Sequence, residues 1–216
     1  VVAVCGFFIR KPDADFQPPA PAREKRRAVN PVAMEATPVQ ALKSPAFWMY
    51  YLWAILLSAA GLAIVSQATG MVREVGAAIS GSAVATIVGL ISIFNGIGRI
   101  LLGGLYDRAG RNATMQLVNI GFILTAGVLV IALKTQSLAL IVAGFILGGL
   151  SYGGVTPTNS AFTSSYFGMK NYPVTFSFIN TNLIIASFGS TIAGALYDGS
   201  QSYLSTFIMM IALAAL

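Results

Sequence analysis

Long stretches without a charged residue dominate the chain, and short polar segments separate them. Five of these stretches reach the roughly 20 residues that a membrane-spanning helix needs. They are Ala46–Val72, Val75–Gly98, Asn112–Leu133, Thr135–Met169 and Asn171–Tyr197. Two further apolar stretches, Val1–Ile9 and Gly199–Leu216, are shorter. The pattern therefore predicts five complete membrane-spanning helices, a sixth that is cut short, and the end of a preceding one.

Two segments depart from this simple alternation. Residues 10–45 form a polar block with the Pro-rich run PDADFQPPAPAREKRR, which predicts a solvated linker. We therefore divide the chain into residues 1–9 as the end of a preceding transmembrane helix, 10–45 as an interdomain loop and 46–216 as a transmembrane bundle. Within the fourth stretch, Val155-Thr156-Pro157 predicts either a kink or the late part of the helix.

Composition narrows the function classes. The 216 residues are 56% hydrophobic and only 9% charged, whereas a soluble domain carries about 25% charged residues. The chain has no His and one Cys, which excludes a His-based triad, a Cys/His zinc site and an internal disulfide. No nucleotide-binding loop and no paired acids lie in a span, so we expect neither an enzyme nor a cofactor or metal.

The cations are unevenly distributed among the loops. The net charge of +6 would suggest nucleic acid in a soluble protein, but here the cations lie in loops between apolar stretches. Counted from the polar block, the odd-numbered loops hold ten Lys and Arg residues and the even-numbered loops hold two. The positive-inside rule then places residues 10–45 in the cytoplasm. We expect a lipid bilayer as the surrounding partner and no nucleic acid.

An internal repeat supports this topology. Gly103–Asp107 is GGLYD, and Gly194–Asp198 is GALYD. Three predicted helices separate the two copies, and because three is odd, the copies must lie on opposite sides of the membrane. Inverted repeats of this kind are typical of secondary transporters.

The first copy continues into a longer motif. Gly103–Arg111, GGLYDRAGR, resembles the loop motif G-x-L-x-D-R-x-G-R of the major facilitator superfamily at every specified position. This resemblance implies an all-α integral membrane protein, the C-terminal six-helix half of a twelve-helix transporter with inverted three-helix repeats. A missing N-terminal half would then be its structural partner. A narrower resemblance, carried by Phe47–Gly70, Ile93–Arg99 and Tyr166–Tyr172, is to the bacterial oxalate/formate antiporter family and implies a bacterial inner membrane.

Arg99 is the one charged residue inside an apolar span. A charge near the bilayer centre costs about 2.5–3.5 kcal/mol, so Arg99 should face a polar cavity or a partner. Asn95 stands four residues earlier on the same helix face. A guanidinium suits a carboxylate bidentately, which favours an anionic substrate. The alternatives are that Arg99 snorkels to the headgroups or pairs with an acid elsewhere. In the antiporter family the arginine that Arg99 matches binds the substrate carboxylate.

The sequence departs from the oxalate transporter at one position. That transporter has a lysine in helix 11, and Leu183 stands at the matching position here. A single cavity cation suits one carboxylate better than two, which favours a monocarboxylate such as lactate, pyruvate or formate over oxalate.

Other polar residues are weaker candidates. Asn180 and Ser187 would line the cavity or make interhelical hydrogen bonds, and Tyr152 falls about where an aromatic residue lines the family's site. Three charged residues of the loop motif, Asp107, Arg108 and Arg111, would act in gating through carboxylate–guanidinium pairs, or would only orient the helices. We therefore expect a secondary transporter, antiporter or proton symporter, of small organic carboxylates. The alternative is another substrate class, such as a drug or sugar.

Overall fold

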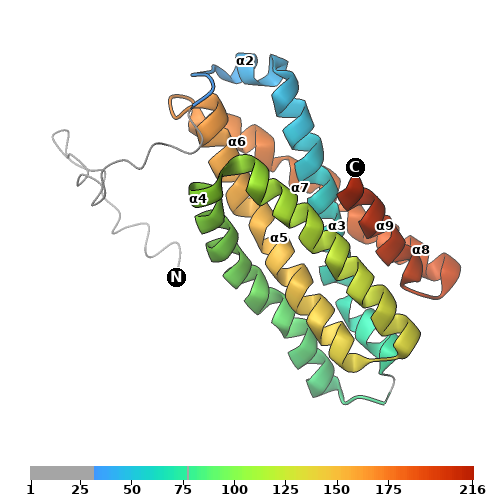
Figure 1. The fold of residues 1–216 in the computed structure, drawn as a ribbon. Coiled ribbons are helices and arrows are strands. Elements are labelled where there is room, and N and C mark those ends of the chain that lie inside the picture. Colours follow the sequence, from blue (N-terminus) through green and yellow to red (C-terminus); the bar gives the residue numbers. More distant parts are fainter. Residues whose placement is uncertain (1–31, 77) are drawn as a thin grey trace, which may run out of the picture.

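The computed structural model describes residues 32–76 and 78–216, and all of their regular structure is helical (Figure 1). The helices are α2 (Pro38–Lys43), α3 (Pro45–Val75), α4 (Gly81–Thr135), α5 (Leu138–Phe167), α6 (Tyr172–Asn180), α7 (Asn182–Ala186), α8 (Phe188–Ser200) and α9 (Leu204–Ala215). The predicted helix end at residues 1–9 and most of the predicted loop at 10–45 lie outside the described residues.

Helix α4 is a hairpin of two membrane-spanning arms. Its 55 residues would extend about 80 Å if straight, far beyond a hydrocarbon core of about 30 Å. Gly110 reverses the direction with φ 87° and ψ 176°, a conformation that glycine adopts without steric cost. Residues 81–109 and 111–135 run antiparallel as a result (Figure 1). The prediction of two spans is confirmed, and Arg99 lies inside the first of them, as expected, because one charge does not end a helix.

The predicted span Asn171–Tyr197 corresponds to the apolar helical stretch Tyr172–Ser200, within which single residues separate α6, α7 and α8. Breaks fall at Thr181 and Ser187, where the backbone closes tighter i→i+3 hydrogen bonds such as Ile184 N–H to Thr181 O (3.0 Å). The hydroxyls of Thr181 and Ser187 donate to the carbonyls of Phe178 and Ile184, each at 2.7 Å. Such side-chain bonds bend helices, and hydropathy does not register them.

The number of crossings agrees with the prediction. Helices α3 and α5, the α4 hairpin and the α6–α8 series are each apolar and long enough to cross a membrane. Because the hairpin crosses twice, these give five spans, and α9 is a shorter apolar helix. Helix α5 continues past Pro157 to Phe167, so Val155-Thr156-Pro157 marks its late part.

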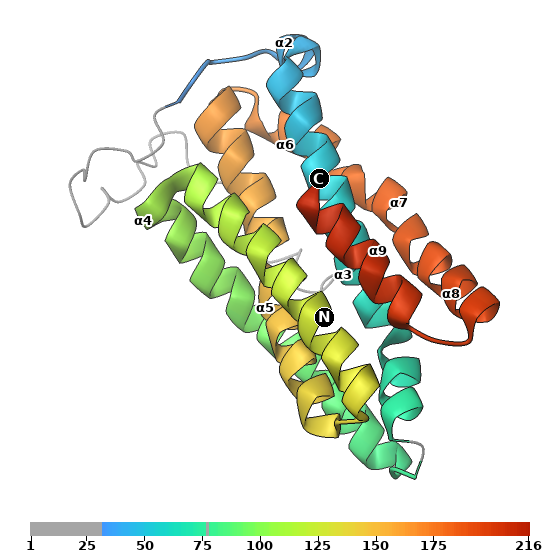
Figure 2. The same ribbon diagram turned by 45° about the vertical axis from the view of Figure 1, so that its right-hand side comes forward.

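The loops fall alternately at the two ends of the bundle. The α4 reversal, α2 and the α5–α6 turn lie at one end, and the α3–α4, α4–α5 and α8–α9 connections lie at the other (Figure 2). Six of the described Lys and Arg residues lie near one of the two ends of the bundle, and four of these lie at the first end: Lys43, Arg108, Arg111 and Lys170. We call it the basic end. The two LYD repeats close the first arm of α4 and α8, at opposite ends, as the inverted repeat requires.

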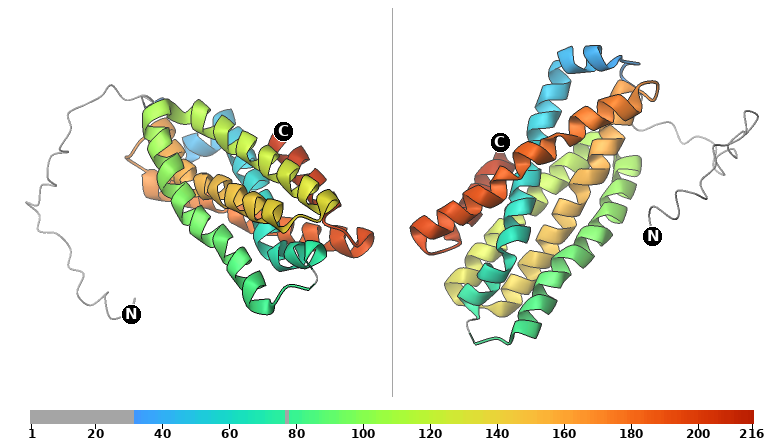
Figure 3. Two further views of the ribbon diagram at one scale, coloured as in Figure 1. Left: turned by 60° about the horizontal axis from the view of Figure 1, so that its bottom comes forward. Right: turned by 180° about the vertical axis from the view of Figure 1, so that it is seen from behind.

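Glycines bring α5 against both arms of α4, which lie on either side of it (Figure 3). A Cβ on Gly144 or Gly148 would meet Leu129 or Thr125 of the second arm. On Gly149 or Gly153 it would meet backbone atoms of the first arm, between Ile91 and Arg99. The two GxxxG patterns therefore permit close approach to two different helices.

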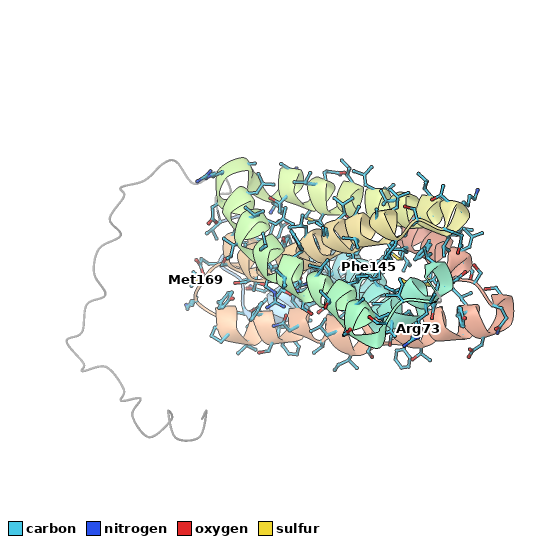
Figure 4. The ribbon with its side chains drawn as sticks, turned by 90° about the horizontal axis from the view of Figure 1, so that it is seen from below. Arg73, Phe145 and Met169 are labelled. Carbon is cyan, nitrogen blue, oxygen red and sulfur yellow. The ribbon has the colours of Figure 1, made fainter. Side chains whose placement is uncertain are left out.

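The core lies between α3, α4, α5 and α9. Phe145 of α5 is fully buried among these helices, whereas Arg73 and Met169 lie at opposite ends of the bundle (Figure 4). At the basic end, residues 32–37 run along the end of α5, where Ala36 is buried and the other five residues are exposed. The N–H groups of Met34 and Ala36 donate to the carbonyls of Tyr166 and Phe167, both at 3.0 Å. These bonds satisfy carbonyls that the last turn of α5 leaves open.

Candidate functional site

Arg99 lies in the middle of the first arm of α4, 11 residues before the reversal at Gly110. At 1.5 Å per residue, this places it roughly 16 Å from the basic end. Its side chain is exposed, and no acidic side chain among the described residues forms an ion pair with it. Arg99 therefore lies at the mid-depth of the bundle, exposed and without an acidic partner among the described residues.

Tyr152 joins Arg99 from the neighbouring helix. It lies at the centre of α5, and its ring covers Gly61 of α3, where an added Cβ would stand 2.7 Å from Tyr152 Cε2. The next residue, Gly153, lies so close to the first arm of α4 that an added Cβ would stand 3.0 Å from Arg99 N. Close packing of α3, α4 and α5 thus places Tyr152 and Arg99 at the same level of the bundle.

The remaining predicted cavity residues lie at different places. Asn95 is half-buried one turn before Arg99, and its carbonyl oxygen lies against Gly153. Asn180 is the half-buried last residue of α6. Ser187 is exposed at the α7–α8 break and donates to Ile184 O. The structure thus brings Asn95 to Arg99, while Asn180 and Ser187 belong to the α6–α8 series across α3.

A buried polar pair, Ser58 and Asn182, lies in the middle of the bundle. Asn182 of α7 is fully buried and donates through Nδ2 to Ser58 Oγ of α3 at 3.2 Å. Its Oδ1 has no hydrogen-bond partner among the described residues. Asn182 directly precedes Leu183, whose side chain is 46% exposed. The sequence feature that could have indicated this pair is the polar dipeptide Thr181-Asn182 within an apolar stretch. A hydropathy average over the whole stretch hides it.

Arg111 at the basic end packs on aromatic rings. Its Cζ lies 5.1 Å from the centroid of Tyr166 and 5.9 Å from that of Phe162. Tyr50 of α3 stacks on Phe162 with centroids 3.8 Å apart, and its hydroxyl donates to Asn159 Oδ1 at 2.8 Å. The rings and the guanidinium therefore tie α3, the second arm of α4 and α5 together.

The other two loop-motif residues, Asp107 and Arg108, are both exposed on the last turn before the reversal. In the described part of the chain they form no ion pair. The adjacent Tyr106 is buried, and its hydroxyl shares a hydrogen bond with Ser165 of α5 at 2.8 Å.

At the end opposite the basic end, a carboxylate joins two helices through hydrogen bonds. Glu74 at the end of α3 accepts from Ser202 Oγ at 2.7 Å and from Tyr203 N–H at 3.0 Å, at the start of α9. The Tyr203 hydroxyl donates to Gln67 Oε1 at 3.2 Å. Burial, reinforced by Tyr197, Glu74 and Asp198, raises the pKa of the Tyr203 phenol above its usual value. Glu74 thus fastens α9 to α3.

At mid-depth, Arg99 and Tyr152 supply a guanidinium and a phenol from neighbouring helices. No group of His, Cys, Asp or Glu within residues 32–76 and 78–216 could hold a metal ion. A family model described as Major Facilitator Superfamily matches residues 1–188. No curated protein matches the chain.

Proposed function

Because the chain belongs to the major facilitator superfamily, we propose that it carries small organic carboxylates such as formate, lactate, pyruvate or oxalate. Members of this family are membrane transporters rather than enzymes. The chain is therefore an integral, multi-pass membrane transporter, and its substrate class is the matter of the proposal.

Arg99 carries the proposal. An exposed guanidinium at mid-depth is costly in lipid and is stabilised by an anion that it can hold through two hydrogen bonds. A cationic drug would be repelled by it, and a neutral sugar would not compensate its charge. We assign substrate contacts to Arg99, Tyr152 and Asn95, and we propose that Asn180 and Ser187 of the α6–α8 series contribute to the cavity from the other side of α3.

The number of cations favours one carboxylate per site. Arg99 is the one described cation away from the bundle ends, and Leu183 presents an apolar side chain where the oxalate transporter has a lysine. This supports formate, lactate or pyruvate over oxalate, as in the oxalate/formate antiporter family that the helices resemble.

Transport would proceed by alternating access between this bundle and the other half of a twelve-helix transporter. In the described spans no Asp or Glu lies near Arg99, so the coupling is either exchange of one anion for another or proton symport through the other half. The loop-motif residues Asp107, Arg108 and Arg111 would hold the basic end closed in one state, which we take to be the cytoplasmic end.

The test is uptake of labelled lactate, formate and oxalate into liposomes that contain the complete transporter. Arg99→Lys keeps the charge but loses the bidentate geometry. Charged hydrogen bonds are worth about 1.5–3 kcal/mol, so we expect KM for the carboxylate to rise about tenfold to a hundredfold.

Arg73→Lys is the matched control, because Arg73 is an exposed cation at the opposite end of the bundle. It should leave KM unchanged. Equal effects of the two substitutions, or no carboxylate flux from the wild-type protein, would overturn the assignment of Arg99 to a carboxylate and leave the transporter fold intact.

A further inference from the structure

An apolar groove of about 380 Å³ runs along the outside of the α4 hairpin. Leu101 and Leu105 of the first arm form one side, Leu117, Ile120 and Leu124 of the second arm form the other, and Leu150 of α5 forms part of the floor. Ser151 is the polar side chain in this lining, and its hydroxyl is already bonded to Leu147 O at 2.8 Å. The groove therefore offers no hydrogen bond to a polar ligand.

The groove is open to the surroundings of the bundle. Leu101, Leu117 and Leu124 are exposed by 47–59%, although they are large aliphatic side chains. In a multi-pass membrane protein, an acyl chain of a lipid can enter such a depression. Its width is set by Gly98 and Gly121, which lie on the floor and let the two arms close on α5 without filling the space above it.

One end of the groove carries a cation. Leu101, Leu105 and Arg108 are spaced i, i+4, i+7, so they form one row along the first arm. Arg108 is exposed and ends this row at the basic end, where the headgroup of a lipid lying in the groove would be. Asp107 and Glu35 also lie at this end, but the described cations Lys43, Arg108 and Lys170 outnumber them even when Arg111 is not counted. Charge complementarity therefore favours an anionic headgroup.

We propose that the groove between the arms of α4 binds an acyl chain of an anionic phospholipid whose phosphate contacts Arg108. The site is separate from the carboxylate site, because the row Leu101–Leu105–Arg108 and Arg99 occupy different faces of the same helix. A lipid bound in this groove would stabilise the α4 hairpin at its reversal.

The test is a titration of the purified full chain with phosphatidylglycerol and with phosphatidylcholine of the same acyl chains, followed by native mass spectrometry. Phosphatidylglycerol should bind more tightly. Arg108→Gln should weaken its binding about fivefold, the effect of one cation near an anionic lipid surface, and should leave phosphatidylcholine unchanged. Lys134→Gln, which removes an exposed cation at the opposite end, should change neither.

A second pair of variants tests the groove itself. Leu124→Trp fills it and should abolish binding of both lipids. Ile123→Trp, one residue away, exposed and outside the lining, should bind as the wild type does. Equal binding of the two lipids, insensitivity to Arg108→Gln, or equal effects of the two Trp variants would overturn the proposal.

Photo-crosslinking of the wild-type chain gives a readout that does not depend on how the variants fold. Phosphatidylglycerol with a diazirine near the end of its acyl chain should label peptides containing Leu101–Leu105 or Leu117–Leu124. Uniform labelling of the helices would show only annular lipid, and labelling confined to another helix would place the lipid elsewhere. Either result would contradict the groove assignment.

Discussion

Gly98 and Gly96 provide a sharp test of the packing that places Arg99. Both lie in the first arm of α4, and both become alanine in the proposed variants. A Cβ on Gly98 would overlap the carbonyl oxygen of Leu150 and stand 2.9 Å from Leu150 C and Cα, whereas a Cβ on Gly96 would meet nothing within 4 Å. Carbon atoms pack best at 3.5–4.0 Å, so Gly98→Ala must move the first arm and α5 apart by roughly 1 Å.

The two substitutions should change stability in opposite directions. Each gains about 1 kcal/mol of helix propensity, but Gly98→Ala also incurs an overpacking cost of about 1–3 kcal/mol against backbone that cannot rotate away. We expect a net difference of about 2 kcal/mol, which corresponds to about 4–8 °C in Tm for a chain of this size.

Thermal melts of the purified protein and carboxylate uptake are the two assays. Gly98→Ala should melt below the wild type and lose uptake, because the shift separates Arg99 from Tyr152. Gly96→Ala should melt at or above the wild type and keep its uptake. If Gly98→Ala melts no lower than Gly96→Ala, the first arm and α5 are not in the close contact that positions Arg99.

Three further predictions use other parts of the molecule. Leu183→Lys adds a second cation to the proposed cavity and should raise oxalate uptake relative to lactate in liposomes; an unchanged ratio would place Leu183 outside the cavity. Arg111→Gln removes the cation above Phe162 and Tyr166 and should cost about 1 kcal/mol, measured as a lower Tm that Arg111→Lys partly restores. Tyr203→Phe removes the hydrogen bond to Gln67 and should cost about 1 kcal/mol. The pKa of the Tyr203 phenol is raised in the folded state, so the contribution of this phenol to the free energy of unfolding is complete below a pH of about 10 and is lost at higher pH. The Tm values of the wild type and of Tyr203→Phe should therefore converge above that pH.

Hydropathy was sufficient to predict the spans because each must bury about 20 apolar residues in lipid, whatever its neighbours are. The charged motif Gly103–Arg111 placed a turn between the second and third spans, and the reversal at Gly110 lies inside it. Hydropathy did not indicate which residue turns, since this depends on one positive φ. The breaks at Thr181 and Ser187 were missed for a related reason. Their hydroxyls bond to their own helix and so do not alter the apolar character of the stretch.

The site was partly predictable because Arg99 is a charge in an apolar span, which one helix reveals by itself. Pairs between distant segments were not. The rings beneath Arg111 lie about 50 residues further along the chain, and Asn182 meets Ser58 from 124 residues away. These contacts depend on how each helix is rotated about its own axis. The hydrophobic periodicity that would indicate this rotation is weak in a membrane protein, because lipid and core are both apolar.

The first arm of α4 relates the two proposals to each other. Arg99 and Leu101 are two residues apart, so they point roughly 200° apart around the helix, while Gly98 between these directions is buried against α5. If the carboxylate cavity lies on the Arg99 side, the Leu101 side must face away from it, toward lipid. One helix would then separate a polar cavity from an apolar groove. Its close contact with α5 at Gly98, Gly149 and Gly153 fixes both directions at once, so a shift of this arm should alter anion uptake and lipid binding together.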